Sequence, residues 1–285
     1  MRKIEESTPA GRTPEVDKNK KEDKRNGKKG SFLFPVIMVI LIGVILFSGY
    51  QVISILTERV EGAEIYEELD EFITVDRKET EKITYRDFVE RAPNIYVNFD
   101  KLQEQNPDVC GWIIFPNTKI NYPVVKGKDN SYYLSHTSTK QRNSCGAIFM
   151  DMNCDREFGD AKTIIYGHRM NNGSMFENLL KYREQAFYDE NPAGILITPK
   201  GSFMLSIIGA REVEDDLKYY RTGFSHDDEF RQEIEILTSG SLIQCIDSAD
   251  MDDDVVMLST CVKGDHSVRF IVMAKIVSMD EFFKN

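Results

Sequence analysis

The chain has 285 residues, of which 41% are hydrophobic and five are cysteine, so it is neither a disulfide-rich miniprotein nor a disordered polypeptide. Its formal net charge is -11. Residues 1–30 contain ten Lys and Arg against six Asp and Glu, a charge of +4, which leaves -15 for the rest of the chain. We expect no nucleic-acid partner for the main body, because phosphate contacts need clustered basic charge.

The first predicted element is a membrane-spanning helix over residues 31–56. Residues 32–50 are nineteen residues without a charge, and the apolar character extends to Leu56. About 20 apolar residues span a hydrocarbon core roughly 30 Å thick. A signal peptide is the alternative, but its apolar core usually has about 7 to 15 residues and precedes a small-residue cleavage pattern. Neither condition fits this segment well, so we expect an uncleaved span.

The charges on either side of this span predict its orientation. Residues 18–29 hold seven basic and two acidic residues, whereas residues 58–71 are predominantly acidic. The positive-inside rule then places residues 1–30 in the cytoplasm as a basic, disordered tail, and residues from 57 onward outside the cell. We therefore expect a single-pass cell-membrane protein with an external domain.

Residues 57–108 are predicted to form a helical segment. Thr84 and Asp87 have the spacing of a capping box ahead of Phe88, and a second helix from about Phe99 is stopped at Pro107.

Residues 109–285 are predicted to be mainly β. Short runs of β-branched and aromatic residues alternate with Gly, Asn, Asp and Pro clusters; the eight runs are WIIF, YPVV, AIFM, TIIY, GILIT, FMLSIIG, VVMLS and VRFIVMAKIV. Eight short strands favour a barrel or sandwich over a doubly wound sheet. Two helices should interrupt them, one after a capping-box pattern at residues 174–177 and one at about 226–239.

The last two strands contain the candidate nucleophile. The run VVMLSTC ends at Cys261, seven polar or turn-like residues follow, and Arg269 begins the next strand. An antiparallel hairpin would bring these two side chains together. A guanidinium beside a thiol favours the thiolate and offers donors to an oxyanion.

A cysteine nucleophile also needs a proton carrier, and histidine titrates closest to neutrality. His168 follows a buried strand at a junction with a loop, which makes it the preferred candidate. His136 in a polar loop, His226 in the first turn of a helix and His266 in the hairpin loop are the alternatives. We expect no cofactor and no metal site, since the chain has no phosphate-binding loop, dinucleotide fingerprint or EF-hand pattern, and the cysteine spacings match no zinc arrangement.

Four short motifs and one residue follow each other along the chain: NPDVCGWI, GAIFMD, IIYGH, LSTC and then Arg269. Together with the anchor and the strand count, they resemble the sortases, membrane-anchored cysteine transpeptidases of Gram-positive bacteria, over roughly residues 85–280. The N-terminal helices and the helix within a long strand connection resemble class B in particular. Met257 departs from the family's usual Thr-Leu-x-Thr-Cys. The resemblance implies a closed eight-stranded β-barrel.

The same resemblance implies a reaction. Cys261 would attack the carbonyl after the Thr of a C-terminal sorting signal, His168 would be the general acid and base, and Arg269 would orient the substrate and support the oxyanion. An amine of a peptidoglycan precursor or a pilin would then resolve the thioacyl-enzyme, as in cell-wall anchoring or pilus assembly. Candidate substrate-binding residues are Ser259, on the same strand face as the nucleophile, and a group in the preceding connection, Tyr219, Tyr220 and Thr222.

Two other functions fit the same residues. In an extracellular cysteine peptidase or amidase, water would resolve the acyl-enzyme. In a non-catalytic, membrane-tethered β domain that binds wall components, Cys261, His168 and Arg269 would be unrelated core and surface residues.

Overall fold

The computed structural model describes residues 30–74, 84–224, 227–250, 252–262 and 265–282. The chain divides into two units, residues 1–54 and 55–285. The helix α1 (Gly30–Glu68) runs from the first unit into the second. Among the described residues, it is the one helix long and apolar enough to cross a membrane, and none of its most apolar window is buried. Length and composition are thus compatible with the predicted anchor, and the helix continues without a break past residue 56.

Short elements connect α1 to the main domain. They are η1 (Leu69–Phe72), β1 (Ile73–Thr74), α2 (Tyr85–Arg91), η2 (Ala92–Asn94), β2 (Tyr96–Val97) and α3 (Phe99–Gln105), with β1 and β2 forming a small antiparallel sheet. The predicted capping box is confirmed, because the Asp87 amide donates to Thr84 Oγ1 over 3.1 Å and the Thr84 amide donates to Asp87 Oδ2 over 3.3 Å. The helix α3 ends two residues before Pro107, as predicted.

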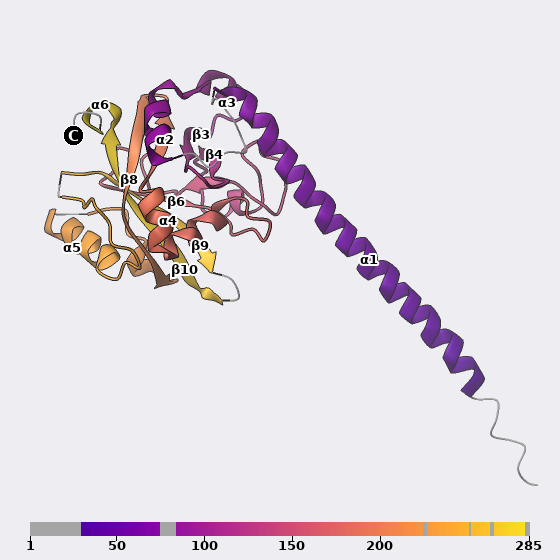
Figure 1. The fold of residues 1–285 in the computed structure, drawn as a ribbon. Coiled ribbons are helices and arrows are strands. Elements are labelled where there is room, and N and C mark those ends of the chain that lie inside the picture. The colour runs from indigo at the N-terminus through magenta and orange to yellow at the C-terminus, as the bar shows by residue number, and fades with distance from the viewer. Residues whose placement is uncertain (1–29, 75–83, 225–226, 251, 263–264, 283–285) are drawn as a thin grey trace, which may run out of the picture. The chain divides into compact units, whose positions relative to one another are not determined.

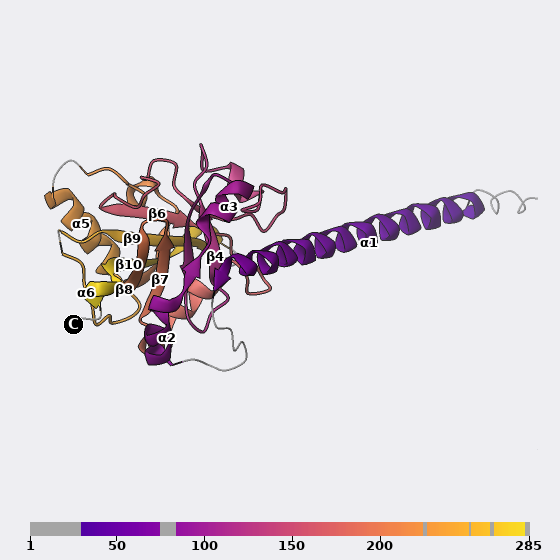
Figure 2. The same cartoon turned by 90° about the horizontal axis from the view of Figure 1, so that it is seen from above.

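The eight predicted strands all form, and they close into a barrel in the order β10-β8-β7-β3-β4-β5-β6-β9 (Figures 1 and 2). Their bounds are β3 (Val109–Ile114), β4 (Asn121–Val125), β5 (Ile148–Met150), β6 (Lys162–Tyr166), β7 (Ala193–Thr198), β8 (Gly201–Glu214), β9 (Val255–Val262) and β10 (Asp265–Ser278). The prediction of a closed, mainly β barrel is confirmed.

Most neighbouring strands of the barrel are antiparallel, but β4 with β5 and β6 with β9 are parallel pairs. A parallel pair needs a long crossover connection. Between β6 and β9 the chain therefore completes β7, β8 and several helices before it returns. The barrel core is densely filled, and Ile113, Leu196, Met257 and Phe270 are all fully buried. Each large apolar side chain contributes roughly 1.5–3 kcal/mol by its burial.

One helix prediction is wrong in type. The capping-box pattern at residues 174–177 begins a 3₁₀ helix, η4 (Phe176–Arg183), and the Ser174 hydroxyl donates to Asn172 Oδ1 instead of capping it. Met175, at the cap position, has a positive φ of 56° and its side chain makes no cap hydrogen bond. Two further 3₁₀ helices of the barrel domain are η3 (Tyr132–Leu134) and η5 (Leu217–Tyr219).

The second predicted helix is present. The helix α5 (Asp227–Thr238) lies in the β8–β9 connection and ends at Thr238, just before the expected stop. Phe230, Ile234 and Leu237 share one helical face and are buried in the barrel core cluster, which explains why the segment is helical. The remaining helices are α4 (Gln185–Glu190) and the C-terminal α6 (Met279–Phe282). The start predicted for α5, at residues 225 and 226, lies outside the described residues.

Candidate active site

Cys261 lies near the end of β9, between two strands that carry the other candidate catalytic residues. On one side, β10 pairs antiparallel with β9, and Arg269 is the direct cross-strand partner of Cys261. Side chains directly opposite in such a pair have their Cβ atoms about 4.5–5.5 Å apart. The hairpin prediction that places these two residues side by side is therefore confirmed.

On the other side, β6 runs parallel to β9 and positions His168. Tyr166 is paired with Ser259, and the Gly167 amide donates to the Ser259 carbonyl over 3.1 Å. His168 and Cys261 each lie two residues beyond this pair along their own chains. Because the two strands are parallel, both residues lie at the same end of this strand pair. Cys261 and His168 are each partly exposed.

The imidazole of His168 is held by a loop carbonyl. Its Nε2 atom lies 2.7 Å from the Leu134 carbonyl oxygen, which can only accept a hydrogen bond. Nε2 therefore carries a proton, and in the neutral ring Nδ1 is the basic nitrogen. The partner is a backbone oxygen 34 residues away in sequence, and no sequence pattern indicated it.

The guanidinium of Arg269 is held by an acid that the sequence did not indicate. Its Nη2 atom donates to Asp215 Oδ2 over 2.6 Å, and the Asp215 amide donates to the Ser267 carbonyl over 2.7 Å. Asp215 follows β8, the strand that pairs with β10 on the side away from Cys261. Arg269 is thus fixed by one neighbouring strand while it lies opposite Cys261 on the other.

Two of the four predicted substrate-binding residues contact each other. The Tyr220 hydroxyl and the Ser259 hydroxyl lie 3.0 Å apart, and the Tyr220 ring stacks on Tyr166 with centroids 5.9 Å apart. Burial raises the pKa of Tyr220, while the hydrogen bond with Ser259 and the charge of Arg269 lower it in part. Ser259 lies two residues before Cys261 on β9, so this hydrogen bond brings the Tyr220 hydroxyl to the strand that carries the nucleophile.

The other two predicted residues belong to the same connection but are held differently. The Tyr219 carbonyl accepts a hydrogen bond of 3.2 Å from Lys162 Nζ, and the Lys218 ammonium lies 4.8 Å from the Tyr219 ring centroid. Lys162 is fully buried and pairs with Glu233 of α5. Thr222 is half-buried further along the connection. A buried ion pair therefore connects this segment to the barrel.

The alternative histidines have other positions. His136 is half-buried, its ring stacks on Tyr132 with centroids 4.0 Å apart, and its Nδ1 atom lies 2.8 Å from the Tyr132 carbonyl. His226 lies outside the described residues, and of His266 only the backbone is described. His168 thus remains the preferred candidate.

The other four cysteines have elevated thiol pKa values, and all five cysteines are free thiols. Burial raises the pKa of Cys110 to about 12 and the pKa values of Cys145, Cys154 and Cys245 each to about 11. These four side chains are therefore neutral thiols near pH 7 and poor nucleophiles. Within the described part of the chain, no group of three His, Cys, Asp or Glu side chains could hold a metal ion.

Comparisons with known proteins agree with this arrangement. The sortase domain family model matches residues 113–277. Sortase B of Listeria monocytogenes is 29% identical over 252 residues, which cover 87% of this chain and 98% of that protein.

Solved structures give the same result. The crystal structure of Staphylococcus aureus sortase B has a TM-score of 0.60 at 30% identity and covers 63% of this chain and 86% of its own. Sortase B from B. anthracis, in complex with AAEK1, has a TM-score of 0.66 at 28% identity and covers 79% of this chain and 100% of its own. From the family match, the relatives and the shared barrel, we conclude that this chain belongs to the sortase family of cysteine transpeptidases, and within it to class B.

Proposed function

We propose that this sortase cleaves a C-terminal sorting signal after Thr, through a thioacyl-enzyme on Cys261, and transfers the protein to an amine. The observation that supports these residue roles is the register of three adjacent strands. Arg269 on β10 is the cross-strand partner of Cys261 on β9, and His168 lies at the end of β6 on the other side.

In the first half of the reaction, Cys261 Sγ attacks the carbonyl carbon of the Thr residue as a thiolate. The carbonyl oxygen becomes an oxyanion, and Arg269 donates hydrogen bonds to it, with its guanidinium oriented by Asp215. His168, in its imidazolium form, gives its Nδ1 proton to the leaving amine as the C–N bond breaks. The products are a thioester on Cys261 and the released tail of the signal.

In the second half, an incoming amine attacks the thioester carbonyl. His168 takes the proton from the attacking nitrogen, the C–S bond breaks, and the new amide is released. One amide is broken and one is made, so the cycle needs no nucleotide. We propose an amine of a peptidoglycan precursor or a pilin as the acceptor, and one sortase B structure that is 30% identical to this chain is complexed with triglycine.

The donor peptide would bind along β9 and the β8–β9 connection. Tyr220 and Ser259 contact each other, and Ser259 lies two residues before Cys261 on β9, which supports a role in contacting the signal. Tyr219 and Thr222 are proposed as further contacts on the same connection.

We also propose that residues 1–30 lie in the cytoplasm, that the apolar part of α1 spans the membrane, and that the catalytic domain lies outside. The basic run before the span and the acidic stretch after it support this orientation. In a chain whose five native cysteines are replaced by alanine, a cysteine introduced at residue 10 would be protected from a membrane-impermeant maleimide in intact cells. One introduced at residue 67, in place of an exposed glutamate, would be labelled. The opposite pattern would reverse the topology.

The test of the reaction uses the full chain in detergent micelles and fluorogenic peptides that carry Asn-Pro-x-Thr or Leu-Pro-x-Thr signals, with and without triglycine. Mass spectrometry should find cleavage after Thr and, with triglycine present, a product joined through a new amide bond. Cys261→Ala should abolish both products, and the matched variant Cys245→Ala should leave them unchanged. Cleavage that persists in Cys261→Ala would remove Cys261 as the nucleophile. Exclusive hydrolysis in the presence of triglycine would argue against this peptide as an acceptor.

A further inference from the structure

The turns of α1 that follow the apolar segment carry a face that contacts the barrel domain. Glu58, Gly62 and Tyr66 are four residues apart, so they lie above one another on one side of the helix. The Tyr66 hydroxyl donates to the Gly146 carbonyl over 2.7 Å, and the Tyr66 ring lies edge-on to Tyr122 of β4 with centroids 5.2 Å apart. All of these residues belong to the second unit of the chain.

The partner of this face is residues 143–146, in the loop between β4 and β5. Asn143 Nδ2 donates to the Glu58 carbonyl over 2.7 Å, and the Ser144 amide donates to Glu58 Oε1 over 2.7 Å. Asn143 is 2% exposed, and its Oδ1 accepts from the Cys145 amide over 2.9 Å. The contact thus includes a buried side chain, Asn143, whose amide nitrogen and oxygen both form hydrogen bonds.

Gly62 allows the two backbones to approach closely. A Cβ atom at this position would lie 2.9 Å from both Asn143 Oδ1 and Cys145 Sγ, closer than real Cβ atoms come. Glycine lowers helix stability, so a glycine inside a helix has a cost that close packing can explain. Gly49, further back in the apolar segment, has nothing within 4 Å of the same position.

The loop that receives α1 is the loop that holds His168. Gly146 has a φ of 61°, and a Cβ on it would lie 3.0 Å from His168 Cδ2, 3.0 Å from the Leu134 carbonyl and 2.6 Å from the Tyr133 carbonyl. The Leu134 carbonyl is the oxygen that accepts the hydrogen bond from His168 Nε2. One glycine backbone therefore lies between the Tyr66 hydroxyl and the histidine ring.

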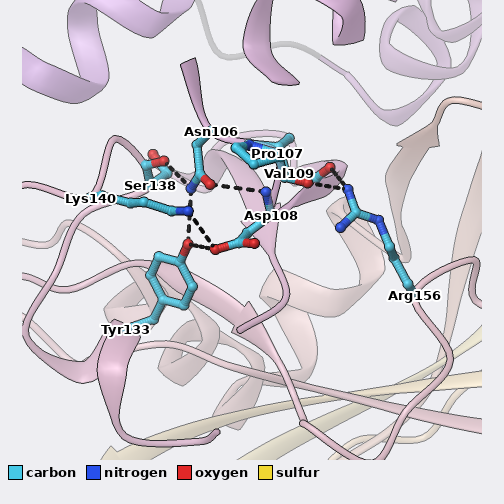
Figure 3. A network of polar contacts seen from close by, with 8 residues as sticks. All are labelled: Asn106, Pro107, Asp108, Val109, Tyr133, Ser138, Lys140 and Arg156. Atoms are coloured by element: carbon cyan, nitrogen blue, oxygen red, sulfur yellow. Dashed lines mark hydrogen bonds and ion pairs between the residues drawn. The ribbon is translucent and has the colours of Figure 1, made fainter. Parts of the chain in front are cut away.

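The middle of the same loop is fixed by a second set of polar contacts (Figure 3). The Tyr133 hydroxyl donates to Asp108 Oδ2 over 2.7 Å, and Lys140 Nζ lies 2.9 Å from the same oxygen. Asn106 Nδ2 donates to the Ser138 carbonyl over 2.7 Å. Residues 143–146 lie beyond this network. There the contacts with α1 add to the loop's own backbone hydrogen bonds, such as the one from the Gly146 amide to the Asn143 carbonyl over 3.1 Å.

We propose that residues 58–66 of α1 are a positioning element for His168. The helix holds residues 143–146, these residues support the ring and the Leu134 carbonyl, and the imidazole is thereby kept in the tautomer that leaves Nδ1 basic. The part of α1 that belongs to the second unit and the proposed catalytic base are consequently coupled through one helix face. This inference rests on the proposed role of His168 as general acid and base.

The first test compares Gly62→Ala with the matched control Gly49→Ala in the full chain in detergent micelles. Both changes raise helix propensity, but only the first places a methyl group against Asn143 and Cys145. Displacement of a catalytic group by about 1 Å can cost roughly 10²-fold in rate, so we expect kcat to fall by at least about tenfold in Gly62→Ala. We also expect the histidine limb of its kcat–pH profile to shift. The profile of Gly49→Ala should match the wild type.

The second test uses Tyr66→Phe, which removes one hydroxyl and keeps the ring, with the exposed Tyr96→Phe as its control. In a chain with ¹³C-labelled histidine, Tyr66→Phe should move the resonance of the His168 ring and shift the pH profile, and Tyr96→Phe should change neither. A thermal unfolding scan shows whether Gly62→Ala folds. If it does not, Tyr66→Phe alone tests whether α1 positions His168. An unmoved His168 resonance and an unchanged pH profile in Tyr66→Phe would overturn the proposal.

A third variant, His168→Ala, separates the role of α1 from the role of His168 itself. His168→Ala should abolish transpeptidation if the histidine is the general acid and base. An active His168→Ala would overturn both statements. An inactive His168→Ala combined with a wild-type profile in Tyr66→Phe would overturn only the role of α1.

Discussion

Arg269 lies directly opposite Cys261 across the β9–β10 pair, and its guanidinium is at the same time bound to Asp215 over 2.6 Å. The residue proposed to support the oxyanion is therefore oriented from the side away from the nucleophile.

Asp215→Asn should lower kcat/KM by up to about fivefold, because a partly exposed ion pair is worth no more than about 1 kcal/mol. In this variant Arg269 keeps its positive charge but loses the carboxylate that orients its guanidinium. Steady-state kinetics with the cleaved peptide would measure the change. Asp216→Asn, whose carboxylate pairs with the exposed Lys218, is the matched control and should leave kcat/KM unchanged. Equal values for the two variants would contradict a role for Asp215.

Gly146→Ala should be strongly damaging, since it combines two separate effects. A positive φ costs a residue with a Cβ roughly 1–2 kcal/mol, and this Cβ would also lie 2.6 Å from the Tyr133 carbonyl. Gly173→Ala separates the effects, because Gly173 has a φ of 80° but no atom closer than 3.6 Å to the built Cβ. We expect Gly173→Ala to lower the unfolding temperature only slightly and to keep activity, and Gly146→Ala to lose both. Similar melting curves for the two would show that the loop can relax around a methyl group.

Lys162→Met should be among the most destabilising single changes in the barrel. Lys162 is fully buried, its partner Glu233 is 4% exposed, and burial lowers the pKa of the lysine. Removing one partner of a buried pair typically costs about 3–5 kcal/mol, whereas replacing both partners with apolar groups is often neutral. Lys162→Met combined with Glu233→Leu should therefore recover most of the stability that Lys162→Met loses. Denaturant unfolding monitored by near-UV circular dichroism measures both, and an equal loss in the double variant would refute this explanation.

The pair of Asp108 with Tyr133 and Lys140 predicts a pH dependence of stability. Burial pushes the pKa of Asp108 upward, but hydrogen bonds from Tyr133 and Lys140 outweigh it, and the net pKa is lowered. A depressed folded-state pKa means that Asp108 stabilises the fold above its unfolded pKa of about 3.9 and that this stability is lost as the pH falls through the folded pKa.

Asp108→Asn should accordingly be less stable than the wild type at pH 7, by about 1 kcal/mol, because a third of the side chain is exposed and solvent screens the interaction. The difference should shrink as the pH falls below about 4. Urea unfolding at pH 7, 5 and 3 would measure it. A difference that stays constant over this range would mean that the charge of Asp108 contributes nothing.

The sequence predicted the parts of the fold and site that depend on local patterns. The eight strands follow from short β-branched and aromatic runs between turn residues, and Cys261 and Arg269 meet because a hairpin joins them. His168 was selected by its place at a strand end, and the parallel register of β6 with β9 agrees with that choice. The family resemblance, also drawn from motifs, is confirmed by the comparisons.

The parts that sequence reasoning missed depend on contacts distant in the chain. The Leu134 carbonyl that holds His168 is a backbone atom, so the type of residue 134 does not reveal it. Asp215 is one of many acids in an acidic chain, and only the β8–β10 register brings it to Arg269. The helix predicted after residues 174–177 forms as the 3₁₀ helix η4, and Ser174 bonds to Asn172 without capping it. A capping-box pattern cannot distinguish that contact from a true cap.

The strand order also links folding to the formation of the site. The strand β9 is inserted between β6 and β10, so the barrel cannot close without the segment that carries Cys261. Pairing of β6 with β9 joins residues more than 90 positions apart, and contacts of such high sequence separation form late and slowly. The barrel therefore closes in the same step that brings Cys261, His168 and Arg269 together. Until the β9–β10 hairpin has paired with β6, the catalytic centre is not assembled.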